Sequence, residues 1–158
     1  MTEPLNLFGA GVEGDPAAPA GYRQRMLAFG PGIGAERLGG TVYELDPGES
    51  VCPYHYEITE EEWLLVLAGS PTLRDPEGEH ELVRGDLVCF PAGEGGAHKV
   101  TNRSDTIARI LMFSTIPKSV DGFPLSICVY PDSNKVGVWP PGGRFRLTDS
   151  VGYWDGEI

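Results

Sequence analysis

With 158 residues, 41% of them hydrophobic, the chain is long enough to fold as one domain around an apolar core. Its formal net charge of −11 argues against a nucleic-acid partner or an anionic membrane surface, since both are bound through clustered lysines and arginines. The 22 glycines and 14 prolines favour many short strands joined by turns over long helices.

Residues 1–21 are rich in glycine, proline and alanine, which predicts an irregular N-terminal arm. The arm lacks the basic start and apolar stretch of a signal peptide, and no window of the chain has the length of a membrane span. We therefore expect a cytoplasmic protein with no membrane partner.

From Tyr22 onward the pattern is that of β-structure, and we expect residues 22–116 to form one all-β barrel or sandwich domain. Short apolar segments alternate with turn sequences such as DPGES (46–50), DPEGEH (75–80) and NRSD (102–105). The expected strands are Arg23–Phe29, Glu36–Leu45, Val51–Glu57, Glu62–Leu67, Glu81–Val83, Leu87–Phe90, His98–Asn102 and Ala108–Ser114.

The predicted strand at residues 62–67 is apolar on both faces, apart from Glu62. Because side chains alternate between faces, Leu64 and Val66 share the face of Glu62, and the other residues occupy the opposite face. A strand that is apolar on both faces needs a cover over its outer face, which the terminal arms, a second sheet or another subunit can supply. Of these we favour another subunit, as a homodimer or an arm-exchanged contact.

Residues 117–158 form a C-terminal extension in which the β pattern is weaker. We expect one strand at Ser126–Tyr130 and two shorter apolar pieces, at Val136–Trp139 and Phe145–Leu147. Large indole side chains such as Trp139 and Trp154 favour a packed position over a solvated one. The extension is therefore expected to pack on the barrel or on a partner subunit.

The three cysteines, Cys52, Cys89 and Cys128, are an odd number and have no short paired spacing. This argues against a disulfide framework and against a cysteine-based zinc site. Each cysteine is expected to be a small buried apolar residue, and Cys52, three residues before His55, is expected to face outward from any site.

Four polar residues occupy positions where this β pattern expects a core. His55 and Glu57 are two residues apart on a predicted strand and share a face, and Glu62 begins the next strand, as an antiparallel neighbour. His98 opens a later strand behind a glycine-rich turn. Buried carboxylates that lack partners cost several kcal/mol each, roughly, and a divalent cation between these side chains would remove that cost. The alternative is a metal-free, hydrogen-bonded core.

The same residues carry a family resemblance that covers about residues 36–114. The first cupin motif contains a glycine, two histidines one residue apart, a glutamate, six spacers and a glycine; here it comprises Gly48, His55, Glu57, Glu62 and Gly69. The second motif comprises Gly85, Pro91, Gly93, His98 and Asn102. The chain thus resembles the single-domain, uncharacterised members of the cupin superfamily. Glu57 replaces the second histidine, one extra residue precedes His55, and two extra residues precede His98.

The resemblance implies a double-stranded β-helix of the jelly-roll type, with N- and C-terminal extensions, around a divalent metal held by His55, Glu62, His98 and, as an open alternative, Glu57. Glu57 can instead turn aside toward a positive side chain, or act as a general base. Two histidines with carboxylates suit Mn, Fe, Zn or Ni, and the added carboxylate favours Mn or Fe.

Two functions remain open from the sequence. The first is a metal-dependent enzyme, an isomerase, oxygenase or lyase, that acts on a small molecule. The second is a non-catalytic module that binds or senses a sugar or an organic acid. Among the remaining residues, His80 is expected on the surface, Asn102 in a turn or at a strand end, and Tyr43 and Arg109 either in a ligand pocket or in the core.

Overall fold

The computed structural model of the chain describes residues 3–116, 119–120 and 123–157. Its strands are β1 (Glu13–Gly14), β2 (Arg25–Ala28), β3 (Leu38–Leu45), β4 (Tyr56–Glu57), β5 (Glu62–Ala68), β6 (Thr72–Asp75), β7 (Gly78–Glu81), β8 (Leu87–Phe90), β9 (Lys99–Thr101), β10 (Ala108–Thr115), β11 (Ser119–Val120), β12 (Phe123–Pro124), β13 (Ser126–Tyr130), β14 (Lys135–Trp139) and β15 (Arg144–Arg146). In these residues the helices are short 3-10 turns: η1 (Pro31–Ile33), η2 (Glu94–Gly96), η3 (Pro131–Ser133) and η4 (Leu147–Asp149). None of the described helices is long and apolar enough to cross a membrane.

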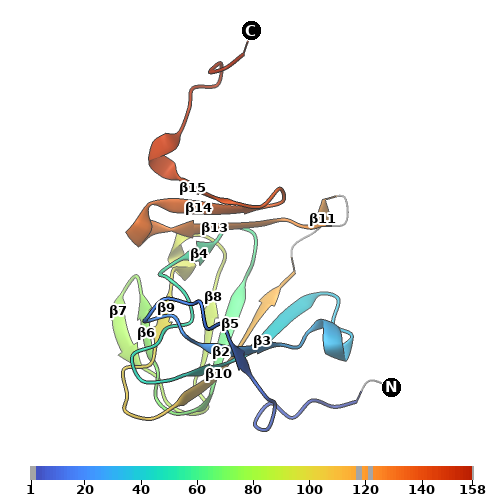
Figure 1. The fold of residues 1–158 in the computed structure, drawn as a ribbon, viewed down its shortest axis with the longest axis vertical. Coiled ribbons are helices and arrows are strands. Elements are labelled where there is room, and N and C mark those ends of the chain that lie inside the picture. Colours follow the sequence, from blue (N-terminus) through green and yellow to red (C-terminus); the bar gives the residue numbers. More distant parts are fainter. Residues whose placement is uncertain (1–2, 117–118, 121–122, 158) are drawn as a thin grey trace.

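Two antiparallel sheets form the barrel, as the all-β prediction requires (Figure 1). The larger has the strand order β1-β2-β3-β10-β5-β8, and the smaller has the order β7-β6-β9. Strand β10 lies at the centre of the larger sheet, where Ile110 pairs with Tyr43 of β3 and Val66 of β5. Strands that are neighbours in the sheet, such as β5 and β10, are thus far apart in the sequence, which is typical of a jelly roll.

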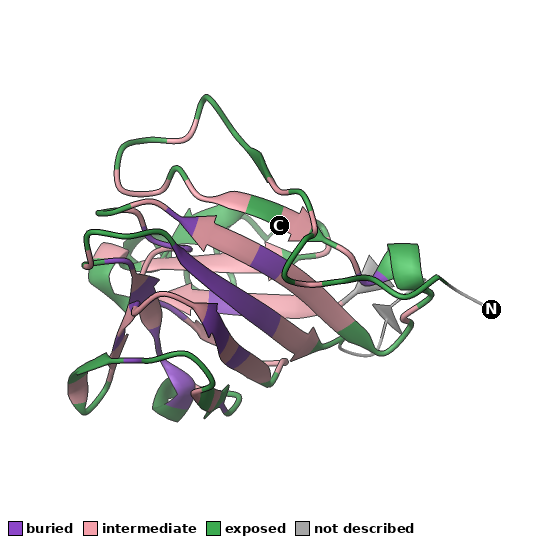
Figure 2. Ribbon diagram, turned by 90° about the horizontal axis from the view of Figure 1, so that it is seen from below, coloured by how far each residue is buried: buried purple, intermediate pink, exposed green. Residues whose placement is uncertain are grey.

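The core lies between the two sheets, because each contributes aliphatic side chains to one buried cluster. Figure 2 shows the buried residues along the strands of the barrel. Leu64 and Val66 of β5 and Ile110 of β10 meet Leu73 of β6 and Val100 of β9 there. All of these side chains are almost completely buried. The predicted alternation of β5 is confirmed, and it places Glu62 on the face that points into the barrel.

The N-terminal arm covers part of the outer face of the larger sheet. Leu7 and Val12 pack against a second apolar cluster, which contains Val42 of β3 and Leu111 of β10. Arg109 fixes the arm in place, since its guanidinium donates to the carbonyl oxygens of Leu7 and Ala10 and pairs with the Glu44 carboxylate. Arg109 is therefore a structural residue, and the arm supplies within one chain a cover that we expected from a second subunit.

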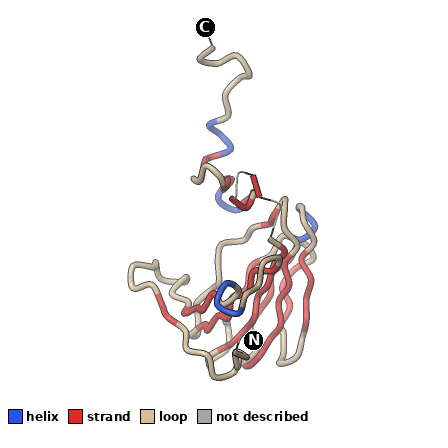
Figure 3. The backbone as a smooth tube through the Cα atoms, turned by 90° about the vertical axis from the view of Figure 1, so that its right-hand side faces the viewer, coloured by secondary structure: helices blue, strands red, loops and turns tan. Residues whose placement is uncertain are grey.

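The C-terminal extension adds a further layer at one end of the barrel (Figures 1 and 3). Strands β15, β14 and β13 form a sheet whose last member is β4, and Cys128 of β13 lies opposite Glu57 of β4. A bidentate ion pair between Arg74 of β6 and Asp132 of η3, at 2.6 Å, also joins this layer to the barrel. Beyond η4 the chain runs away from the barrel (Figure 3).

Most of the predicted strands are present, but two segments of the sequence were interpreted wrongly. Residues 51–54 are irregular and only Tyr56–Glu57 forms a strand, since Pro53 has no amide hydrogen to donate to a ladder. The turn predicted at residues 75–80 is shorter than expected. It joins the hairpin strands β6, which ends at Asp75, and β7, which begins at Gly78. Strand β6 was missed because its sequence, TLRD, has a single large apolar residue, Leu73.

Candidate metal centre

The structure brings the four predicted site residues together at the end of the barrel beneath the C-terminal layer. His55 lies directly before β4, Glu57 on β4, Glu62 at the start of β5, and His98 directly before β9. The backbones of His55 and His98 form an isolated antiparallel bridge, with N–H to carbonyl distances of 3.1 and 2.8 Å. This bridge points both imidazoles to one side, with ring centroids 4.6 Å apart.

The ligand atoms of these side chains face one another. Glu62 Oε2 lies 3.6 Å from His55 Nε2 and 3.5 Å from His98 Nε2, and Glu57 Oε1 lies 3.9 Å from His55 Nε2. Two donors that each lie about 2 Å from one cation are about 3–4 Å apart. The observed spacings therefore match those of a metal centre.

Glu62 reaches the histidines by a different route from the one predicted. The sequence suggested that β4 and β5 are antiparallel neighbours, but Glu62 pairs with Phe90 of β8 and Ser114 of β10. Strand β4 pairs instead with β13. The C-terminal extension occupies the edge of β4, so Glu57 and Glu62 approach the centre from separate sheets.

Both histidines are held in one orientation by backbone carbonyls. His55 Nδ1 lies 3.0 Å from the Pro53 oxygen, and His98 Nδ1 lies 2.9 Å from the Gly96 oxygen. Each Nδ1 donates its hydrogen there, which turns Nε2 toward Glu62 and leaves that nitrogen, once it is deprotonated, free to bind a cation. A Cβ on Gly96 would lie 1.9 Å from the Pro91 oxygen, so this close turn requires glycine.

Burial and nearby charges shift the pKa values of the four groups in different directions. Burial raises the pKa of Glu57 to about 7, and the nearby carboxylates of Glu60 and Glu62 act in the same direction. Burial also lowers the pKa of His98 to about 4, which keeps its imidazole neutral and able to ligate.

The remaining pair is held charged by its contacts. Burial opposes the charge of Glu62, but its interactions with the facing imidazoles of His55 and His98 outweigh burial and lower the pKa of Glu62. Burial likewise opposes the charge of His55, and its interactions with Cys52 and Glu62 outweigh burial and raise its pKa. Glu62 is therefore an ionised ligand at neutral pH.

Three buried side-chain atoms in and beside the centre lack hydrogen-bond partners among the described residues. They are Glu57 Oε2, Glu62 Oε2 and His98 Nε2. Buried polar atoms in proteins are almost always paired, and each orphan costs about 1–3 kcal/mol. A divalent cation between His55, Glu62 and His98 would accept the lone pairs of Glu62 Oε2 and His98 Nε2, so these residues fit the metal that the sequence predicted. Glu57 Oε2 lies in a neighbouring group with His55 and Cys128.

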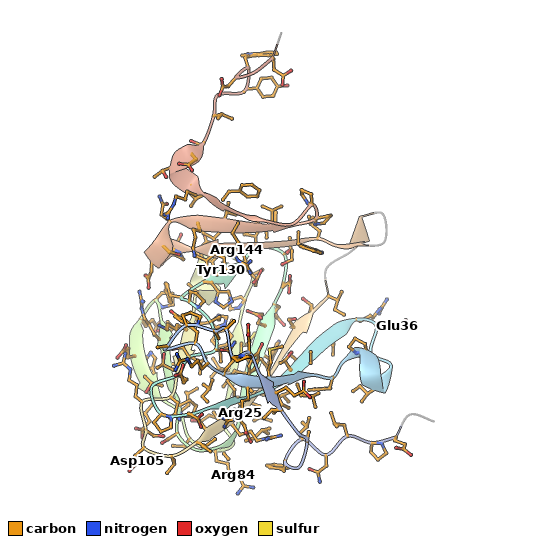
Figure 4. The ribbon with its side chains drawn as sticks, in the orientation of Figure 1. Arg25, Glu36, Arg84, Asp105, Tyr130 and Arg144 are labelled. Atoms are coloured by element: carbon orange, nitrogen blue, oxygen red, sulfur yellow. The ribbon has the colours of Figure 1, made fainter. Side chains whose placement is uncertain are left out.

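Two cavities flank the centre. One, of about 270 Å³, lies inside the barrel and is lined by Tyr43, His55, Glu62 and Met112, among others. The other, of about 360 Å³, lies in the C-terminal layer. Its lining includes Glu57, Ser126, Cys128, Tyr130 and Arg144. Figure 4 shows Tyr130 and Arg144 together on that layer.

The sequence missed the residues that β13 brings to the site. Cys128 is buried beside Glu57, as its register requires, and the Tyr130 ring stacks on His55 with centroids 5.9 Å apart. Sequence spacing gave no signal for either contact, because some 70 residues separate them from their neighbours. The glycine-rich turn before His98 did carry a signal for Gly96.

Two expectations for the cysteines were wrong. Cys52 lines the barrel cavity, with its Sγ 3.3 Å from His55 Nδ1, since the bend after Val51 turns it inward. Cys89 is exposed on the edge strand β8, where no further strand of the described chain covers its outer face. Cys128 alone is buried as predicted.

Two other expectations are confirmed. His80 is exposed, with its Nε2 3.2 Å from the Asp75 carboxylate. Asn102 is completely buried, and its amide donates to the carbonyl oxygens of Leu45 and Thr106 at 2.8 and 2.7 Å. Asn102 therefore holds a turn and has no part in the metal centre.

Residues 41–114 match the model of the cupin domain. The chain contains a cupin domain. This confirms the resemblance that the two motifs carried, and the jelly-roll barrel agrees with it. A comparison with curated proteins finds no match.

Solved structures superpose on between 73% and 97% of the chain. A sugar phosphate isomerase of the cupin superfamily from Silicibacter pomeroyi is 25% identical, with a TM-score of 0.78, and the alignment covers 97% of this chain and 98% of that one. A protein from Acidithiobacillus ferrooxidans, provisionally described as a sugar phosphate isomerase, is 22% identical, with a TM-score of 0.72 and coverages of 84% and 81%. The polyketide cyclase RemF from Streptomyces resistomycificus is 23% identical, with a TM-score of 0.60 and coverages of 73% and 80%. The last two similarities concern the fold alone.

Proposed function

We propose that this cupin binds one divalent transition metal through His55, Glu62 and His98, and that it isomerises a phosphorylated sugar with Glu57 as the general base. The observation that carries the proposal is the convergence of buried donor atoms without partners at the spacing of a metal centre. The mixed nitrogen and carboxylate donors suit Mn or Fe best, with Zn and Ni as alternatives.

The proposed reaction suits the chemistry of the site. A divalent cation bound there supplies Lewis acidity that polarises a carbonyl or hydroxyl oxygen. Isomerisation of an aldose to a ketose moves one proton from C2 to C1 and one from the C2 hydroxyl to the C1 oxygen, so it needs no oxidant or further reactant. Glu57 takes the proton from C2 and returns it to C1, because a carboxyl whose pKa is about 7 both accepts and donates protons near neutrality.

The cavity of the C-terminal layer supports a phosphorylated substrate. Glu57 lines this cavity at one side, and Arg144 lines it from β15. Arg144 forms no ion pair within the described residues, and a guanidinium binds phosphate oxygens in a bidentate manner. Similarity over the whole chain to a protein named a sugar phosphate isomerase supports the same substrate class.

The proposal is tested with Mn²⁺-loaded protein and a panel of aldose phosphates in deuterated buffer. We expect deuterium to enter at the carbon next to the carbonyl, as measured by NMR, and we expect Glu57→Gln to lower kcat about 10²–10⁴-fold. Glu94→Gln is the matched control. Glu94 is an exposed carboxylate at the start of η2, and the residue before it, Gly93, donates its backbone N–H to the carbonyl oxygen of Glu57. Sugar phosphate binding with no exchange on any member of the panel would favour the non-catalytic binding module instead.

We also propose a homodimer that forms through the C-terminal tail. Tyr153 and Trp154 are 85% and 76% exposed, contrary to the packed position predicted for Trp154. The tail (residues 150–157) leads away from its own barrel, so a second chain is the surface on which we propose that these rings pack (Figure 3). Light scattering on the full chain and on a Trp154→Ser variant measures this, and a monomeric wild-type protein would rule it out.

A further inference from the structure

Cys128 lies within reach of the metal centre, although it is not part of the set that the cupin motifs define. It occupies the middle of β13, directly opposite Glu57 of β4, and it is 8% exposed. Its Sγ, a ring nitrogen of His55 and a carboxylate oxygen of Glu57 all lie within 4.8 Å of one another. These three side chains form a second group of donors beside the first.

The two donor groups overlap at one side chain. His55, Glu62 and His98 form the first group, and His55, Glu57 and Cys128 form the second. The Nε2 atom of His55 lies 3.6 Å from Glu62 Oε2 and 3.9 Å from Glu57 Oε1, so it can contribute to either group. An imidazole nitrogen has one lone pair and binds one cation at a time. Occupation of the two positions is therefore mutually exclusive.

An independent observation indicates a ligand at the second group. Glu57 Oε2 is buried and has no hydrogen-bond partner in the described chain, although Glu57 lies against Cys128. A thiol donates a single weak hydrogen bond, which cannot satisfy both carboxylate oxygens. A cation between Glu57, His55 and Cys128 would satisfy the remaining oxygen.

The two groups differ in chemical softness. The first offers two imidazoles and a carboxylate, and the second offers an imidazole, a carboxylate and a thiolate. Thiolate ligands select ions such as Zn²⁺ and Cd²⁺, whereas carboxylate oxygens suit Mn²⁺. Binding at the second group forms a metal–sulfur bond and releases the thiol proton to the solvent, with no change of oxidation state.

We propose that His55, Glu57 and Cys128 form a second, thiolate-containing cation position that takes thiophilic divalent ions and excludes a cation from the position at His55, Glu62 and His98. The position depends only on the geometry of these side chains. Its consequence rests on the proposed function: a thiophilic ion removes Glu57 from proton transfer and His55 from the catalytic cation, so it inhibits the enzyme.

The test follows two cations in the full-length protein. Cd²⁺ reports thiolate ligation through a ligand-to-metal charge-transfer absorption in the ultraviolet, and Mn²⁺ binding is measured from the loss of the free-ion electron paramagnetic resonance signal. We expect the cadmium–thiolate band to appear with one equivalent of Cd²⁺ and to displace bound Mn²⁺. Cys128→Ser should lose the band and keep Mn²⁺ binding, whereas His98→Ala should lose Mn²⁺ binding and keep the band.

Matched variants identify the sulfur. Cys89→Ser changes an exposed thiol remote from the centre, and Cys52→Ser changes the thiol beside His55 Nδ1. Both should retain the band. A band that survives in Cys128→Ser or disappears in Cys52→Ser, or Cd²⁺ binding without any band, would overturn the second position and leave the proposed function intact. Failure of Mn²⁺ to bind the wild-type protein, with a normal cadmium band, would overturn the proposed function alone.

Discussion

The barrel and the C-terminal layer are built from similar short antiparallel strands, but they bury very different amounts of apolar surface. In the barrel, Leu64 and Ile110 are completely buried between two sheets. In the C-terminal layer, β14 is half-exposed along most of its length, β15 is exposed throughout, and Cys128 is the one fully buried member of β13. The barrel therefore provides the stability, and the layer is held mainly by its pairing with β4 and by a few polar contacts.

The contrast shows how a modest extension can add chemistry to a stable scaffold. The barrel rigidly holds His55, Glu62 and His98, since each sits at a strand end or bridge of its two sheets. The layer brings Cys128, Tyr130 and Arg144 to the opposite side of Glu57. Functional side chains are often added on segments of low local stability that a rigid scaffold positions.

The largest expected effect is a difference between the barrel and the C-terminal layer in how much truncating an apolar side chain lowers the free energy of unfolding. Leu64→Ala in the barrel core should lower the free energy of unfolding by about 2–5 kcal/mol, because it removes a fully buried side chain and leaves a cavity. Val136→Ala in half-exposed β14 should cost less than about 1 kcal/mol. Urea denaturation of both variants measures the difference. Equal losses would mean that the layer packs far more tightly than its exposure indicates.

A second prediction tests whether His98 of the barrel binds the metal. His98→Ala should weaken Mn²⁺ binding by about a hundredfold or more, since second-shell changes alone cost 10–100-fold. Saturating Mn²⁺ should raise the Tm of the wild-type protein, because a ligand of the native state stabilises it, and should leave the Tm of His98→Ala unchanged. His80→Ala, at an exposed histidine, should behave as wild type. The same loss in both variants would contradict the assignment.

The smallest expected effect concerns the ion pair that joins the layer to the barrel. Hydrogen bonding to Arg74 lowers the pKa of Asp132 below its ordinary value of 3.8. The pair therefore stabilises the folded chain above that value and loses this contribution as the pH falls through the lowered pKa. The side chains are 40% and 50% exposed, so solvent screening limits the contribution to about 0.2–1 kcal/mol.

Asp132→Asn tests this contribution. At pH 7 its free energy of unfolding should be lower than that of the wild type by this small amount, and the difference should vanish once the pH falls below the lowered pKa of Asp132. Urea titrations at several pH values measure it. A difference that persists at low pH would mean that Asp132 stabilises the fold through its packing and not through its charge.

Much of the barrel could be predicted from the sequence because local chemistry determines it. The alternation of residues 62–67 placed Glu62 on the inner face, and the turn residues separated most strands correctly. The two motif spacings also identified His55, Glu57, Glu62 and His98 as one constellation. Residues of two short motifs lie close together in space when the strands that follow the motifs belong to one barrel.

By itself, the sequence determined the all-β class, the inward face of β5 and the identity of the four converging side chains. Only the tertiary structure decided that β13 pairs with β4, that Cys128 and Tyr130 flank Glu57 and His55, and that the N-terminal arm covers the outer sheet. The physical reason is that side-chain alternation and turn chemistry are local, whereas strand pairing over some 70 residues depends on which edges remain free after the barrel has closed.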